Sequence, residues 1–260
     1  MSGLRREEVA LLAGISVEYY TRLERGNARG VSPSVLDGLA RALRLDEAER
    51  AHLSDLLRAS DTTAPPRRRP AQQRVRLSVQ RVVDSMTGTP AYVRNRRLDI
   101  LYANHLARAL YSDLYRDRTR PVNVARFVFL DARATQFYLD WETAANDAVA
   151  ILRAEAGRDP HDRALSDLVG ELSTRSDEFR VRWAAHNVRF HRTGDKSFHH
   201  PVVGDVTVTY EVMELPADPG HVLIALTAEP NSSSQDALNL LASWAATPDE
   251  VSAVPVEEDA

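Results

Sequence analysis

Two adjacent prolines in an arginine-rich stretch limit how this chain can fold, because they interrupt it after its first quarter. Pro65 and Pro66 resist both helix and strand, since proline lacks a backbone donor and restricts the residue before it. Around them, residues 61–81 carry six Arg and one Asp, whereas residues 1–59 carry nine Arg and nine Asp or Glu. We therefore predict four parts: residues 1–59, a linker over 60–74, a larger domain over 75–247, and a disordered acidic tail over 248–260.

Composition excludes several classes of site. The 260 residues contain no cysteine, which excludes disulfides, thiolate zinc sites, iron–sulfur clusters and a cysteine nucleophile. No run of about 18 apolar residues predicts a membrane span, and the first residues lack the hydrophobic region of a signal peptide, so a cytoplasmic location is expected. The net charge of −4 requires any nucleic-acid contact to come from a local basic patch. Lys196 is the only lysine among 33 basic residues, a bias typical of a GC-rich genome.

Apolar positions in the first 59 residues follow helical spacing. A short helix begins near Arg5 and ends at Gly14, a residue suited to a left-handed helix end. Its apolar face is formed by Val9, Ala10, Leu12 and Ala13. Ser16 then caps a second helix, which ends at Gly26-Asn27. Two further helices are predicted from Ser32-Pro33 to Leu43 and from Asp46 to Arg58. The first two helices and their turn form a helix-turn-helix.

The stretch LRREEVALLAGISVEYYTRLERG over residues 4–26 resembles the lambda-repressor-like (XRE) family. This resemblance implies that the helix from Val17 enters the major groove of double-stranded DNA. The predicted DNA contacts are Arg5, Arg6, Ser16, Val17, Glu18, Tyr19, Thr21, Arg22 and Arg25. A helical bundle used for protein contact, with these charges as a solvated face, is the alternative.

These predicted DNA contacts differ in role. Arg22 is the base-edge candidate, because its fork matches guanine O6 and N7. Contacts to phosphate are predicted for Ser16, Thr21 and Arg25, and contacts to the DNA backbone for Arg5 and Arg6. Glu18 either accepts from cytosine N4 or repels phosphate.

One feature departs from the XRE pattern. Such domains normally have a helix before the position of Arg5, and here only residues 1–4 precede it. The first helix is therefore predicted to be missing. Its loss is expected to expose one face of Val9, Leu12 and Leu39.

The larger part mixes helices and short strands. A helix over Gln80–Met86 precedes two strands, 89–93 and 98–103, joined by the polar turn Asn95–Arg97. Asn104 caps a helix over 105–111. There follow the apolar segment Val124–Leu130, helices over 132–141, 141–156, 161–174 and 176–186, strands over 188–191, 197–200, 206–215 and 222–228, and a helix over 236–246. A first hairpin that joins later strands around intervening helices is a PAS-like α+β layout. The whole chain is therefore predicted to be α+β, with an all-α helix-turn-helix domain followed by a PAS-like α+β domain.

Four segments narrow the resemblance. PAYVRNRRLDIL (90–101), NVARFVF (123–129), LRAEAGRD (152–159) and FHHPVVG (198–204) are similar to the MmyB-like transcription regulators. The similarity extends from Leu4 to about Trp244, and the domain order is the same. This resemblance implies a sensor domain with an elongated apolar pocket for a small apolar acid, a medium- or long-chain fatty acid.

Such a ligand needs an anchor for its carboxylate, because an unpaired buried ion is very costly. Arginine is the natural partner. The predicted ligand contacts are Tyr92, Arg94, Asn104, Asn123, Arg126, Phe127, Trp183, His186 and Tyr210, with Ile100, Phe129 and Val208 also in the pocket wall. The alternatives are core packing for each aromatic residue, a helix cap for Asn104, a surface charge for Arg94 and an ion pair for Arg126.

Other chemistries find little support. His186, His191, His199 and His200 match no known metal-ligand spacing, so no metal or other cofactor is predicted. The chain lacks the nucleophile-elbow, Walker and dinucleotide motifs, so it is not expected to be an enzyme. The sequence thus predicts a ligand-responsive, sequence-specific transcription regulator. The alternative is a protein-interaction module, or a haem or metal sensor, with a non-functional helix-turn-helix.

A homodimer is also predicted, because major-groove readers commonly bind paired half-sites. The helix over 236–246 presents Leu238, Leu241 and Trp244 on one side. These residues either dock on the sensor domain or pair between subunits.

Overall fold

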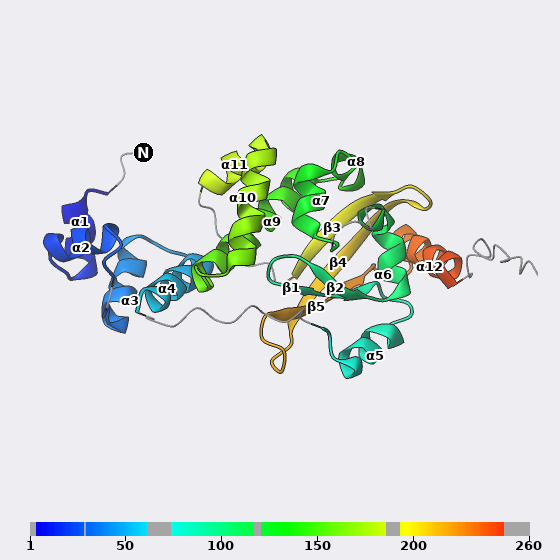
Figure 1. Ribbon diagram of the computed structural model, residues 1–260, viewed down its shortest axis with the longest axis horizontal. Helices are drawn as coiled ribbons and strands as arrows, with labels where there is room; N and C mark the ends of the chain where they lie inside the picture. The colour runs from blue at the N-terminus through cyan, green and yellow to red at the C-terminus, as the bar shows by residue number, and fades with distance from the viewer. Residues whose placement is uncertain (1–3, 29, 62–73, 117–120, 186–192, 247–260) are drawn as a thin grey trace, which may run out of the picture.

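A computed structural model describes residues 4–28, 30–61, 74–116, 121–185 and 193–246 (Figure 1). A group of helices at the N-terminus is followed by a larger part built around one five-stranded sheet. The predicted acidic tail, the predicted strand 188–191 and most of the predicted linker lie outside the described residues.

Four N-terminal helices form where the sequence predicts them. They are α1 (Arg6–Ala13), α2 (Val17–Glu24), α3 (Pro33–Ala42) and α4 (Glu47–Asp61). Gly14 ends α1 with a left-handed φ of 71°, and the Ser16 side chain accepts the Tyr19 N–H at 3.1 Å. Helix α2 ends at Glu24 rather than at Gly26-Asn27, and α4 continues to Asp61, past the predicted domain boundary at residue 59.

The core of this helical group is small but closed. Val9 and Leu39 are buried with Ala42, and Ile15, Tyr20 and Leu23 pack against them. The expectation that Val9 and Leu39 would be exposed is therefore wrong. Gly38 lets α3 cross α1 closely enough to bury both residues, since a Cβ there would lie 2.5 Å from the Ala13 carbonyl oxygen. Leu12 is exposed as expected, with 59% of its surface accessible.

The sheet is antiparallel throughout, in the order β2-β1-β5-β4-β3. Its strands are β1 (Ala91–Asn95), β2 (Ile100–Ala103), β3 (Thr193–His200), β4 (Gly204–Glu214) and β5 (His221–Thr227). The hairpin β1–β2 joins the later strands through the pairing of β1 with β5. This is the layout predicted from the sequence, and the α+β fold class is confirmed.

Helices enclose the sheet on both faces (Figure 1). Helix α5 (Leu77–Ser85) covers one face, where Val79 and Val83 pack on Val93. The opposite face, here called the inner face, is covered by α7 (Val124–Leu130), α8 (Ala134–Phe137) and α9 (Trp141–Arg158), with α10 (Arg163–Arg175) and α11 (Asp177–Ala184) packed behind them. The segment predicted as a helix over 132–141 is broken between α8 and α9.

Three further elements complete the inner-face core. Helix α6 (His105–Leu110) runs into a single 3-10 turn, η1 (Ser112–Tyr115). Helix α12 (Ser233–Ala246) packs against α6 and buries Leu238 and Leu241 in the same core. Trp244 does not dock with them, and 54% of its surface is accessible.

The N-terminal helices meet the larger part through α4 and α9. Arg158, the last residue of α9, forms an ion pair with Asp55 of α4 at 3.6 Å. Next to it, Gly157 packs directly under the imidazole of His52. One long helix therefore reaches from the inner face of the sheet to the helix-turn-helix group.

Candidate functional site

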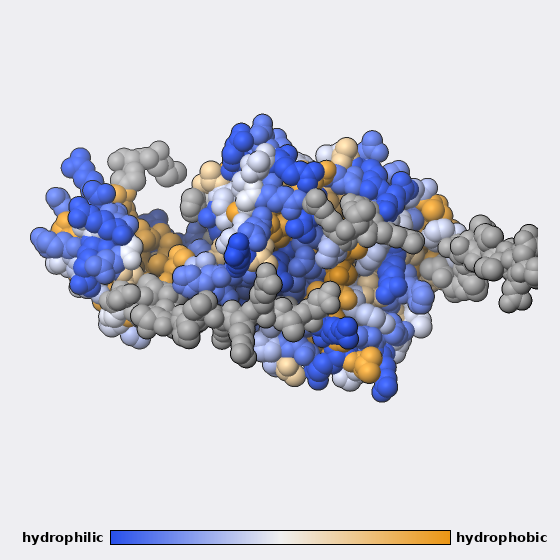
Figure 2. Space-filling model, in the orientation of Figure 1, coloured by the Kyte–Doolittle hydropathy of each residue, from blue (hydrophilic) through white to orange (hydrophobic). Residues whose placement is uncertain are grey.

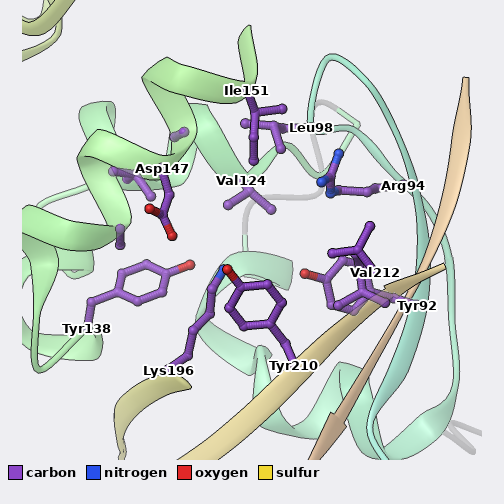
Figure 3. A pocket seen from close by; sticks show the side chains of 14 residues that line it. Tyr92, Arg94, Leu98, Val124, Tyr138, Asp147, Ile151, Lys196, Tyr210 and Val212 are labelled. Carbon is purple, nitrogen blue, oxygen red and sulfur yellow. The ribbon is translucent and has the colours of Figure 1, made fainter. Parts of the chain in front are cut away.

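A small cavity lies between the inner face of the sheet and helices α7 and α9 (Figure 3). Its volume is about 40 Å³. The polar lining residues are Tyr92, Arg94, Tyr138, Asp147, Lys196 and Tyr210. The apolar lining residues are Leu98, Val124, Val128, Ala144, Ala148, Ile151, Val212 and Ile224.

Strand alternation places most of the polar side chains. Tyr92 and Arg94 lie two apart on β1, so both face the inner side. Tyr210 of β4 and Lys196 of β3 reach the same side, and the Lys196 ammonium lies 4.8 Å from the centre of the Tyr210 ring. Gly194 makes room for that ring, because a Cβ there would lie 3.2 Å from the Tyr210 hydroxyl oxygen.

Arg94 is the most deeply placed cation of the cavity. Its side chain points into the cavity in Figure 3, and only 8% of the residue is accessible. Its Nη1 donates to the backbone oxygen of Asn95 at 3.1 Å. Burial lowers the Arg94 pKa, and the nearby hydroxyls of Tyr92 and Tyr210 oppose that shift. A guanidinium held in this way favours an anion, which would offset its desolvation.

Lys196 and Asp147 form the other charged side of the cavity. Burial lowers the pKa of Lys196, Asp147 raises it, and Arg94 lowers it further. Burial also raises the pKa of Tyr138, and of Tyr210 to about 12, with Asp147 contributing to both shifts. Both tyrosines are therefore neutral hydrogen-bonding groups at neutral pH. In Figure 3 the Tyr138 and Tyr210 hydroxyls point toward the Lys196 ammonium.

Three of the predicted polar ligand contacts do not line this cavity, because each is engaged elsewhere. The Asn104 carbonyl accepts from Ala107 N–H at 2.8 Å as the cap of α6, and its amide donates to backbone oxygens at the end of α5. Asn123 caps α7 through the Arg126 N–H at 3.0 Å. Arg126 itself forms an ion pair with Glu171 of α10 at 2.9 Å.

The other predicted contacts are distributed through the cores. Phe127 packs edge-on against Phe137 in the inner-face core, and Trp183 stacks on Phe179 in the core behind α9. Ile100, Phe129 and Val208 also belong to these cores rather than to the cavity lining. His186 lies outside the described residues. Of the nine predicted ligand contacts, Tyr92, Arg94 and Tyr210 come together.

The cavity also differs in shape from the elongated apolar pocket that the resemblance implied. Six of its 14 lining residues are polar, and 40 Å³ is room for about three water molecules. Sequence reasoning missed Tyr138, Asp147 and Lys196. One signal was available for Lys196, since it is the only lysine of the chain.

The second candidate site is the outer face of α2. All nine predicted DNA contacts are at least partly accessible, and Figure 2 shows this end of the molecule covered largely by hydrophilic residues. The Arg22 guanidinium carbon lies 4.6 Å from the centre of the Tyr19 ring. This stacking holds the fork of Arg22 on the outer face of the helix.

Local bonds engage several of these side chains. Thr21 donates its hydroxyl hydrogen to the Val17 carbonyl at 2.8 Å, the hydrogen that a phosphate contact would need. Arg6 pairs with Glu24 at 2.6 Å, which ties α1 to α2. The Arg5 backbone N–H donates to Glu8 at 2.6 Å. The side chains of Ser16, Arg22 and Arg25 are exposed on the same helix and its caps.

The described ranges contain no cluster of three or more His, Asp or Glu side chains suited to a metal ion. None of the described helices is both long and apolar enough to cross a bilayer.

Comparison with known families gives two matches. A family described as the MmyB-like transcription regulator ligand binding domain matches residues 75–241, and one described as a helix-turn-helix domain matches residues 2–53. Both are domains of transcription regulators and not of an enzyme family. Comparison with curated proteins gives no significant match.

Proposed function

We propose that this chain, which belongs to the MmyB-like transcription regulators, changes its hold on DNA when a carboxylic acid with an apolar chain, of the fatty-acid type, enters its sheet domain. The family resemblance read from the sequence is confirmed. The chain is a helix-turn-helix DNA-binding transcription regulator with a ligand-binding domain. The identity of the ligand, the residues that bind it and the dimer are what we propose.

The buried guanidinium of Arg94 is the observation that carries the ligand proposal. A cation at this depth, which donates a hydrogen bond to the backbone oxygen of the next residue, is suited to a carboxylate that binds it in a bidentate fashion. Leu98, Val124 and Ile151 form an apolar wall on α7, α9 and the β1–β2 turn. The ligand's chain would pack against that wall. A long acyl chain exceeds 40 Å³, so its binding requires the wall to open.

Helix α9 is the proposed path from ligand to DNA. Its middle, with Asp147 and Ile151, lines the cavity, and its last turn contacts α4 through Gly157 and Arg158. Opening the wall would displace α9 and with it the helix that holds the DNA-binding group. The ligand can shift DNA occupancy only if it prefers one position of α9 over the other.

The proposed DNA contacts are the exposed residues on the outer face of α2. Arg22 would read a base edge, and Ser16 and Arg25 would bind phosphates.

We also propose that two copies bind paired half-sites. The exposed side chains of Leu240 and Trp244 on α12 support a contact between subunits.

Ligand binding is tested by titrating the full chain with decanoate and myristate in a calorimeter. Arg94→Gln should weaken binding about 10–100-fold, the value of hydrogen bonds to a charged group. Arg126→Gln is the matched control, because Arg126 pairs with Glu171 away from the cavity, and it should leave the affinity unchanged. Equal affinity of the Arg94 variant and the wild type would show that Arg94 does not bind the ligand's carboxylate.

DNA binding is tested by selecting duplexes from a random pool and measuring affinity across salt concentrations. Arg22→Ala should weaken the best sequence by about 10–100-fold and relax specificity. Arg25→Ala should weaken all sequences alike and lower the salt slope by about one. No loss of specificity in the Arg22 variant would exclude Arg22 from base readout.

A further inference from the structure

We propose that the ligand carries, besides its carboxylate, an uncharged polar group such as a hydroxyl or an amide, bound by Lys196 and Asp147 on the side of the cavity opposite Arg94. The inference rests on the proposed function, because it takes the carboxylate at Arg94 as given. It makes Lys196 and Asp147 the residues that select among acids of similar chain length.

The identity of residue 196 is the first observation. The chain uses Arg at 32 of its 33 basic positions, and the one Lys lines the cavity. The compositional bias cannot account for this exception. An ammonium is compact and directs its donors from a single atom, whereas a guanidinium is a wide planar fork. A lysine on β3 with its ammonium over the Tyr210 ring therefore directs its donors at a single small polar group.

The polar groups around Lys196 are the second observation. Asp147, Tyr138 and Tyr210 line the same side of the cavity, and in Figure 3 their polar ends point toward the Lys196 ammonium. An acyl methylene placed there would offer these polar groups no hydrogen bond and would keep water away from them. The unmet hydrogen bonds would lower the affinity. An ammonium and a carboxylate within electrostatic range offer a donor and an acceptor together. A hydroxyl or an amide is complementary to both.

The charge of the lining is the third observation. Arg94 and Lys196 are cations and Asp147 is an anion, so the charged lining residues sum to one positive charge. One ligand carboxylate balances that charge. A second anion or an ammonium on the ligand would leave an uncompensated charge in a buried site, which is costly. The second ligand group is therefore polar but uncharged.

The test compares decanoate with its 2-, 3-, 5- and 10-hydroxy derivatives by calorimetry on the full chain. At least one hydroxy isomer should bind the wild type at least about tenfold tighter than decanoate. Lys196→Met, which keeps most of the length of the side chain, should abolish that preference. Asp147→Asn, which keeps the shape of the side chain, should also reduce the preference. Arg126→Gln should retain it.

Each result separates the two proposals. If decanoate and every hydroxy isomer bind the wild type equally, or if Lys196→Met retains the preference, this inference is overturned and the Arg94 anchor stands. If no acid in the series binds, the proposed function fails and the inference fails with it. Thermal melting of each variant confirms that a lost preference reflects the site and not the fold.

Discussion

A Cβ atom on Gly157 of α9 would lie 2.3 Å from Cε1 of His52 in α4. No real Cβ makes so short a contact, so the His52 ring occupies space that only a glycine at position 157 leaves open. The contact lies at the junction between the DNA-binding helices and the ligand domain. It sits ten residues along α9 from Asp147 in the cavity wall.

Gly157→Ala should therefore weaken the link between ligand and DNA. The added methyl forces the His52 ring or the whole of α4 away, at an overpacking cost of about 1–3 kcal/mol. Ligand and DNA should each still bind, but decanoate should change operator affinity less than in the wild type. Gly170→Ala in α10 is the control, because a Cβ there meets nothing within 4 Å. It should stabilise the protein by up to about 1 kcal/mol and leave the coupling intact. Adding His52→Ala to the Gly157 variant should restore the coupling.

Gly38→Ala should unfold the N-terminal helices selectively. Alanine is favoured over glycine in a helix by about 1 kcal/mol, but here the new Cβ meets the Ala13 carbonyl oxygen at 2.5 Å. That atom is backbone, so α1 as a whole must move, and we expect a net loss of about 2 kcal/mol. Operator binding should fall while decanoate binding is unchanged. A variant that binds its operator as tightly as the wild type would show that α1 and α3 separate without cost.

Local signals in the sequence predicted the framework well. Ser16 and Asn104 cap helices where they were expected, because a cap depends only on the next three residues. The joining of the first hairpin to the later strands followed from the order of these elements.

The cavity was harder to predict because it depends on contacts between distant elements. Strand alternation brings Arg94 inward, but nothing local distinguished it from Arg126, whose partner Glu171 lies 45 residues away. Asp147 lies on α9, and which side of that helix faces the sheet is decided by packing against α7 and α10. Only the composition bias could have singled out Lys196.

Asn104→Ala should destabilise the ligand domain strongly. Its carbonyl accepts from Ala91 and Ala107, and its amide donates to the backbone oxygens of Met86 and Thr89 at 2.9 and 2.8 Å. The side chain thus ties α5, β1 and α6 together. Removing it leaves several buried backbone groups without partners, at a cost of about 3 kcal/mol or more. Denaturant unfolding measures this loss. Asn146→Ala, an exposed position on α9, should cost less than about 0.5 kcal/mol.

His221→Leu should stabilise the protein, and more so in acid. Burial lowers the pKa of His221, opposed by Asp218, and neither ring nitrogen has a hydrogen-bond partner among the described residues. Between that lowered pKa and the ordinary value near 6.5, the unfolded chain binds more protons than the folded one, so stability falls as the pH drops. Leucine has neither the unpaired polar atoms nor the protonation. We therefore expect the free energy of unfolding to rise by about 1 kcal/mol at pH 7.5, and by more at pH 5. Urea midpoints at both pH values measure it, with the exposed His161→Leu as control. A stability gain that is equal at pH 7.5 and pH 5 would assign the acid sensitivity to other groups. His200 is the first of these to test, because burial also lowers its pKa.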